Sequence, residues 1–176
     1  MSTTQRLLCL LLLVFAPLAI AGEEDFHAGT LIEDFGQIAT VKDAQPLPAN
    51  TRLMVAFDVA KEAAEGEANR SLNSAARFLN MHVEAGVPAN QLSVAIVVHG
   101  GASKDLLNAD KLGHENPNAA LITALLEAGT SITLCGQTAA YYDIEAADLL
   151  PGVDMVLSAM TQHALLQQQG FTLNPF

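Results

Sequence analysis

The sequence has 176 residues, of which 19 are acidic and 8 are basic, so its formal net charge is −11. A chain this acidic repels nucleic acid and anionic membrane surfaces, and no basic cluster offsets the charge. The motifs of serine hydrolases, phosphate-loop NTPases, dinucleotide enzymes and thioredoxin-type oxidoreductases are absent, which argues against those four classes.

Residues 1–21 have the parts of a secretory signal peptide. Arg6 supplies the positive start, residues 7–20 form a 14-residue apolar run, and a small-x-small motif ends at Ala21. A membrane anchor is the alternative, but the run is shorter than the roughly 20 residues of a spanning helix. The acidic Glu23–Asp25 also follows it, instead of a basic segment. We predict a cleaved signal and a periplasmic or secreted protein that has no membrane contact after cleavage.

Cleavage leaves 155 residues with a formal net charge of −12, because Arg6 is lost and no acidic residue is. This length suffices for one domain with a sizeable core. Cleavage also removes Cys9, so Cys135 becomes the only cysteine. In an oxidising compartment a lone cysteine is buried and inert, paired between chains, or kept as a reactive thiol.

The mature chain divides into an arm and a domain. Residues 22–50 contain scattered Gly and Pro and predict an extended N-terminal arm, with a short strand within 36–41. The domain, residues 51–176, begins with an apolar run at 53–59, which is typical of a strand buried on both faces. Asp58, near the end of this strand, can line a pocket or face solvent.

Helices and strands alternate from there on. Apolar residues recur at helical spacing over 72–83, and residues 92–98 predict a second buried strand. Asn116 and Pro117 are suited to the cap and first position of the next helix, which Gly129 ends.

The third strand is predicted at 131–134, followed by a sharp turn at Cys135 and a helix from Gln137. The remaining elements are a fourth core strand, a last helix and a short edge strand, at 153–159, 161–169 and 170–173. This alternation predicts an α/β fold with a mostly parallel sheet of about five strands covered on both faces.

Cys135 is the main candidate for chemistry. In open parallel sheets, functional sites lie where the strands end and the following helices begin. Free N–H groups at the start of a helix stabilise a thiolate. Gly136 lets backbone amides approach the sulfur, and Gln137 or Thr138 can donate a hydrogen bond to it. The alternative is a buried cysteine that continues the strand as a small apolar residue.

His99 and Gly100 follow the preceding strand, so they are expected at the same sheet edge as Cys135. A histidine there can lower the pKa of the thiol or take its proton; the alternative is that it caps the Gly-Gly turn. His114 lies in a loop that can fold over this edge and add to the pocket. Because no pair has the tight spacing of metal ligands, we expect no metal and no cofactor. The other histidines are interpreted as surface or packing residues: His27, His82 and His163.

The segments Val94-Ala-Ile-Val-Val-His-Gly100 and Ile132-Thr-Leu-Cys135-Gly136, with the strands around them, resemble the DsrE/DsrF-like sulfur-relay proteins, in particular their exported single-domain branch. The resemblance spans residues 51–173. It implies a three-layer α/β/α domain that assembles into trimers or hexamers. In the cytoplasmic relay members, the cysteine of this turn carries a persulfide that passes to a partner protein. That role would fall on Cys135 alone.

Three functional hypotheses follow. The first is an exported sulfur carrier or sulfurtransferase, in which Cys135 exchanges sulfane sulfur with a protein or a small sulfur compound, and His99 or the helix start stabilises the anion. The second is a non-enzymatic oligomeric binding or assembly module with a structural cysteine. The third is a redox or metal sensor that uses Cys135 and the two histidines, His99 and His114.

Overall fold

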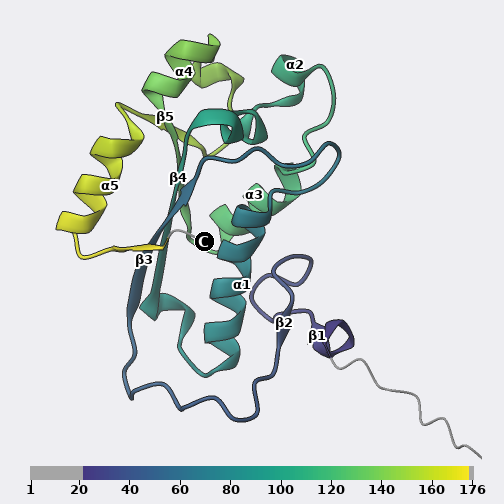
Figure 1. Ribbon diagram of the computed structural model, residues 1–176, viewed down its shortest axis with the longest axis vertical. Coiled ribbons are helices and arrows are strands. Elements are labelled where there is room, and N and C mark those ends of the chain that lie inside the picture. The colour runs from purple at the N-terminus through teal and green to yellow at the C-terminus, as the bar shows by residue number, and fades with distance from the viewer. Residues whose placement is uncertain (1–21, 175–176) are drawn as a thin grey trace, which may run out of the picture.

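A five-stranded parallel sheet forms the centre of the computed structural model, which describes residues 22–174 (Figure 1). The strand order is β6-β5-β4-β3-β7, and every neighbouring pair is parallel. The strands are β3 (Leu53–Val59), β4 (Leu92–Val98), β5 (Ser131–Cys135), β6 (Asp154–Val156) and β7 (Thr172–Asn174). The α/β prediction with about five strands is therefore confirmed, and the carboxyl ends of β3, β4 and β5 share one edge.

Helices cover both faces of this sheet, which makes three layers (Figure 1). The helices α1 (Arg70–Glu84) and α3 (Ala119–Glu127) lie on one face, and α5 (Ala159–Gln168) lies on the other. The main core fills the α1/α3 side with large fully buried residues, among them Phe57, Leu72, Ile96, Leu121, Leu125, Ile132 and Leu134. The core beneath α5 is smaller and consists of Ala56, Ala95, Val97, Cys135, Ala159 and Leu166.

The N-terminal segment lies against α1 of its own chain. It contains a two-residue pairing between β1 (Phe26–His27) and β2 (Ile38–Ala39), which confirms the short strand expected near residue 38. The fully buried Asn80 side chain holds the segment by accepting from the N–H of Ile32 and donating to three carbonyls, those of Ile32, Phe35 and Gly36. The predicted signal peptide, residues 1–21, lies outside the described residues.

Two predicted boundaries were wrong for identifiable reasons. Helix α3 begins at Ala119 with Asn118 at its cap position. Asn116 instead caps the turn directly before the helix: its side-chain oxygen accepts the N–H of Asn118, and its amide donates to the carbonyls of Asp105 and Leu107. Strand β6 covers only three residues, because the Ser158 hydroxyl accepts the N–H of Thr161 and starts α5 at Ala159.

Strand β6 was expected to be a core strand, and this expectation was wrong. Its three residues are exposed or half-buried, as suits a strand at the edge of the sheet. Two further helices, α2 (Ala109–Leu112) and α4 (Gly136–Tyr142), lie near the carboxyl edge of the strands (Figure 1). None of the helices between residues 22 and 174 combines the length and the apolar character that crossing a membrane requires.

Candidate functional site

A hollow of about 250 Å³ lies at the carboxyl edge of the sheet, where three strand ends meet the start of α4 and one face of α5. Strand β3 contributes Asp58, β4 is followed by His99, β5 ends at Cys135, and α5 contributes His163. The rest of the lining is Gln137, Thr138, Ser158, Ala159 and Met160. The parallel register thus brings together side chains that are far apart in the sequence.

Cys135 is a free thiol whose residue is only 6% exposed, although it lines this hollow. Burial raises the pKa of the thiol, but hydrogen bonds to the sulfur outweigh it and bring the pKa below its ordinary value. The groups near the sulfur that lower the pKa are the N–H groups of Thr138, Ala159 and Gln137 and the hydroxyl of Thr138, although none forms a hydrogen bond of ordinary cap geometry with Cys135. The arrangement therefore favours the thiolate, which is the nucleophilic form of cysteine.

Local backbone geometry explains how these donors reach the sulfur. Gly136 follows Cys135 directly, and a Cβ at this position would lie 2.6 Å from the carbonyl oxygen of Val156. Only glycine allows α4 to start this close to the link between β6 and α5. Gln137 also spans that link, because its side-chain amide donates to the carbonyl of Leu157 across 3.3 Å.

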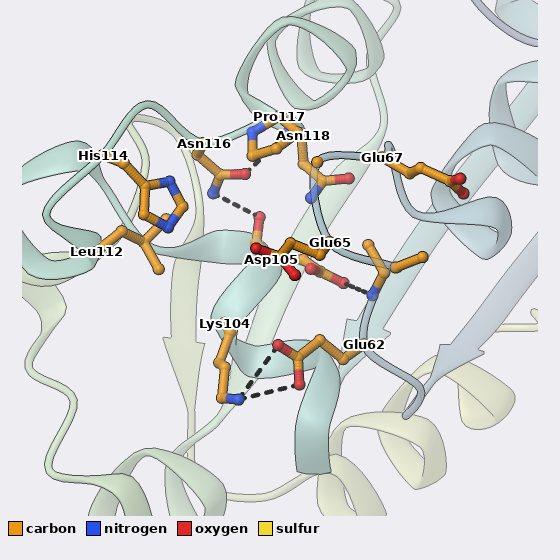
Figure 2. Close-up of a pocket in the computed structure, with 13 residues that line it drawn as sticks. Glu62, Glu65, Glu67, Lys104, Asp105, Leu112, His114, Asn116, Pro117 and Asn118 are labelled. Carbon is orange, nitrogen blue, oxygen red and sulfur yellow. Dashed lines mark hydrogen bonds and ion pairs between the residues drawn. The ribbon is translucent and has the colours of Figure 1, made fainter.

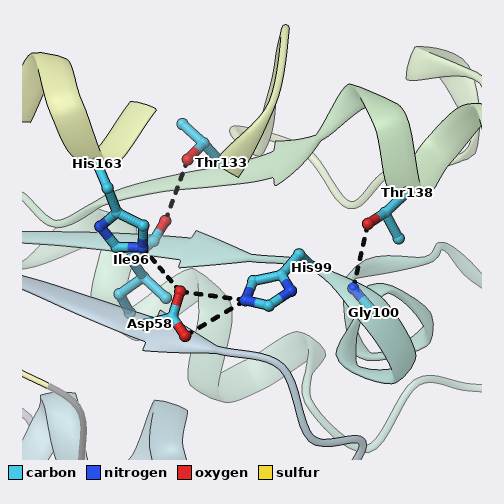
Figure 3. A network of polar contacts seen from close by, with 7 residues as sticks. All are labelled: Asp58, Ile96, His99, Gly100, Thr133, Thr138 and His163. Atoms are coloured by element: carbon cyan, nitrogen blue, oxygen red, sulfur yellow. Dashed lines mark hydrogen bonds and ion pairs between the residues drawn. The ribbon is translucent and has the colours of Figure 1, made fainter. Parts of the chain in front are cut away.

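The two histidines of the site, His99 and His163, both bind the carboxylate of Asp58 (Figure 3). The Nε2 atom of His99 lies 3.1 Å from Oδ1 of Asp58, and the Nε2 atom of His163 lies 2.8 Å from the same oxygen. Both side chains are partly buried, with 32% of His99 and 15% of His163 exposed. The site therefore contains an oriented imidazole pair beside the thiol.

His163 was expected to be a surface or packing residue, and the structure places it in the hollow instead. Its position in α5 explains this. His163 comes four residues after the buried Ala159, so the two side chains share the helix face that meets the sheet. Ser158 as the cap of a helix that starts at Ala159 was the sequence signal that could have placed His163 on this face, although it does not identify Asp58 as its partner.

The expected pocket residues do not all share the hollow. Gln137 lines it with His99 and Cys135. Gly100 lies beside it and donates its N–H to the hydroxyl of Thr138 across 3.2 Å (Figure 3). His114 lines a separate hollow of about 410 Å³, next to Leu112, Asn116 and the loop that carries Glu62 and Glu65 (Figure 2). It can therefore add nothing to the chemistry of Cys135 in this conformation.

The polar side chains around His114 hold the loops of this second hollow together. Its Nδ1 atom pairs with the carbonyl of Glu115, and the buried Asp105 carboxylate accepts hydrogen bonds from the N–H of Ala63 and the side chain of Asn69. Lys104 pairs with Glu62 at the rim of the same hollow (Figure 2). Between residues 22 and 174, no group of three or more His, Cys, Asp or Glu side chains is placed to hold a metal ion.

Comparison with known proteins gives the family of this domain. Residues 53–175 match the model of the DsrE/DsrF-like family. The chain belongs to the DsrE/DsrF-like family. Among curated proteins, none matches the sequence of this family member.

Two solved structures resemble this DsrE/DsrF-like chain. One is a protein of unknown function, MTH1491, from Methanobacterium thermoautotrophicum, with 18% identity and a TM-score of 0.56. The other is the ychN protein from E. coli, with 15% identity and a TM-score of 0.54. In each case the match covers 70% of this chain and 99% of the other. At this level of identity, the likeness establishes a shared fold.

Proposed function

We propose that this DsrE/DsrF-like protein carries sulfane sulfur on Cys135 as a persulfide. The observation that carries the proposal is the position of the thiol, which lies at the start of α4 and lines the hollow, where nearby N–H groups and the Thr138 hydroxyl lower its pKa. A cysteine with a purely structural role needs no such donors, because an uncharged thiol is a weak acceptor. The same donors would stabilise the anion of a bound persulfide.

The chemistry is a displacement at sulfur. The Cys135 thiolate attacks the outer sulfur of a donor R–S–SH, a new S–S bond forms at Cys135, and the S–S bond of the donor breaks. The donor leaves as R–S⁻, which takes up one proton to become R–SH, and the protein holds Cys135–S–SH. Delivery to an acceptor thiolate is the same exchange in reverse, so no external oxidant or reductant is needed.

The donor and acceptor in this proposal are a protein or a small sulfur compound on the exported side of the membrane. The hollow is small, so a donor must present its terminal sulfur there and leave its bulk outside. Export itself is tested by fractionating cells that express the full chain. A periplasmic or secreted product that starts at Gly22 supports the proposal, and a cytoplasmic product with residues 1–21 retained overturns this part of it.

The function is tested by the intact mass of the mature protein before and after incubation with a sulfane-sulfur donor, beside Cys135→Ser. We expect the wild type to gain one sulfur, which a thiol reductant removes, and the variant to gain none. No gain by the wild type, with Cys135 alkylated only after unfolding, would refute the carrier role.

A second candidate, a non-enzymatic assembly module, is favoured by the apolar side chains exposed around α5. Leu157 is 71% exposed and Met160 is 81% exposed, and Leu165 and Leu173 are about half exposed. Monomeric proteins seldom leave such groups in water together, so we propose a homo-oligomer, a trimer or hexamer. Light scattering of the wild type and of Met160→Glu tests this: the wild type should be oligomeric and the variant smaller. A monomeric wild type contradicts the proposal.

A further inference from the structure

The Asp58 carboxylate accepts hydrogen bonds from two imidazole rings at the carboxyl edge of the sheet. Oδ1 of Asp58 is 3.1 Å from Nε2 of His99 and 2.8 Å from Nε2 of His163, and Oδ2 is 3.3 Å from Nε2 of His99. An ionised carboxylate only accepts hydrogen bonds, so each Nε2 atom must carry a proton. In each neutral ring, the free lone pair is then on Nδ1, and that atom takes any further proton.

The two rings differ in what surrounds Nδ1. Nδ1 of His163 is buried and has no hydrogen-bond partner among the described residues. A proton added there would be a buried donor without an acceptor, which is unfavourable. The His99 side chain is about twice as exposed. His99 is therefore the ring of the pair that can exchange a proton with a molecule bound in the hollow.

We propose that His99 donates the proton that the departing thiolate takes during sulfur transfer, and that His163 is a positioning residue which acts on His99 through Asp58. This assignment rests on the proposed sulfur-carrier function. When Cys135 attacks R–S–SH, the S–S bond to R breaks and R–S⁻ receives the proton from Nδ1 of His99. His99 returns to its neutral form, still hydrogen-bonded to Asp58 through Nε2.

The role of His163 follows from the shared oxygen. Its hydrogen bond to Oδ1 occupies part of the acceptor capacity of Asp58, so the carboxylate stabilises a charged His99 less than it would alone. A more weakly held proton is a better acid for the leaving group. The other titratable group that lines the hollow is Cys135, and its thiolate acts on His99 in the same direction as Asp58. His163 thus weakens the hold of Asp58 on the His99 proton.

The test is the rate of sulfur loading as a function of pH, followed by intact mass in the mature protein. Loading needs the Cys135 thiolate together with a protonated His99, and the limb of the profile that disappears in His99→Gln is the one that reports His99. His163→Leu should move the limb that His99→Gln removes to higher pH, because Asp58 then holds the His99 proton alone. Asp58→Asn should move it down. His163→Gln, whose amide can replace Nε2 as a donor, should keep the wild-type profile.

His99→Gln should lower the maximal loading rate about 100-fold, the range of general acid catalysis. A His163→Leu profile that coincides with the wild type would overturn the assignment, since a residue that only packs has no effect on His99. If His163→Leu does not fold, as judged by its circular dichroism, the His163→Gln and Asp58→Asn profiles decide the question.

A measurement that needs no sulfur separates this inference from the proposed function. Nitrogen chemical shifts of the two rings show which atoms carry protons in the mature wild-type protein. We expect His163 to keep a single proton on Nε2 over the range in which His99 gains its second. Protonation of His163 first refutes the assignment even if Cys135 loads. Failure of Cys135 to gain sulfur, with the expected ring shifts present, refutes the carrier function instead.

Discussion

The hydroxyl of Thr138 accepts a hydrogen bond from the backbone N–H of Gly100 across 3.2 Å, and it also contacts the sulfur of Cys135. A hydroxyl has one proton to donate. Because Gly100 occupies an acceptor position, that proton is free to point at the sulfur. The turn after β4 therefore orients a donor for the cysteine at the end of β5, which links two neighbouring strand ends.

Thr138→Val removes this donor and keeps the shape of the side chain. Losing a hydrogen bond to the thiolate should raise the pKa of Cys135 by about one unit. Less thiolate is then present at neutral pH, so alkylation by iodoacetamide should slow about tenfold there and approach the wild-type rate at high pH. The measurement is the alkylation rate as a function of pH.

Thr138→Ser is the matched control, because it keeps the hydroxyl and loses only a methyl group. Its rate profile should lie close to that of the wild type. Equal profiles for the valine and wild-type proteins would show that the backbone N–H groups of Gln137 and Ala159 stabilise the thiolate without help from the hydroxyl.

Asp105 is 6% exposed, and burial raises the pKa of its carboxyl despite hydrogen bonds from Asn69 and the N–H of Ala63. Its protonated form is thus favoured in the folded state. The stability that this contributes is present below the pKa of the unfolded chain and is lost as pH rises through the folded pKa. Asp105→Asn cannot ionise, so its free energy of unfolding should increase relative to the wild type as pH rises from acid to neutral.

The asparagine at position 105 should fold well, because both hydrogen bonds reach the same oxygen, Oδ2, and an amide oxygen can accept both. Asp105→Ala is the contrasting variant. It leaves two donors without their acceptor and should cost about 1–3 kcal/mol. Urea unfolding at acid and neutral pH measures both effects. Parallel pH curves for Asp105→Asn and the wild type would contradict the predicted linkage.

Asn80 offers a test of how the N-terminal segment is held. Asn80→Ala leaves one N–H and three carbonyls of that segment without their partner, and it should cost about 2–4 kcal/mol. Asn73→Ala removes a single bond, to the N–H of Gly36, and should cost about 1 kcal/mol. Limited proteolysis should also cleave residues 22–50 faster in Asn80→Ala. Equal losses in the two variants would mean that the additional hydrogen bonds of Asn80 contribute no more to stability than the single bond of Asn73.

The sequence predicted the parts of the fold that depend on local pattern. Strands β3 and β4 were expected at 53–59 and 92–98 and have those bounds, because parallel strands buried on both faces are continuous apolar runs. Cys135 was likewise expected where a strand meets a helix. The contact between Asp58 and His163 joins residues 105 positions apart, so neither periodicity nor a motif could indicate it. It depends on how α5 lies on the sheet, which is decided by tertiary packing.

Gly136 provides the sharpest test of the turn that carries the cysteine. In Gly136→Ala the new methyl group would overlap the carbonyl oxygen of Val156, and a backbone atom cannot move aside as a flexible side chain can. We expect a loss of about 1–3 kcal/mol and a displaced start of α4, with fewer donors on Cys135 and a slower alkylation at neutral pH. Gly101→Ala is the control, because its Cβ would meet no atom closer than 3.6 Å. If both variants match the wild type in urea unfolding and alkylation, the close approach at Gly136 is not what holds the thiol in place.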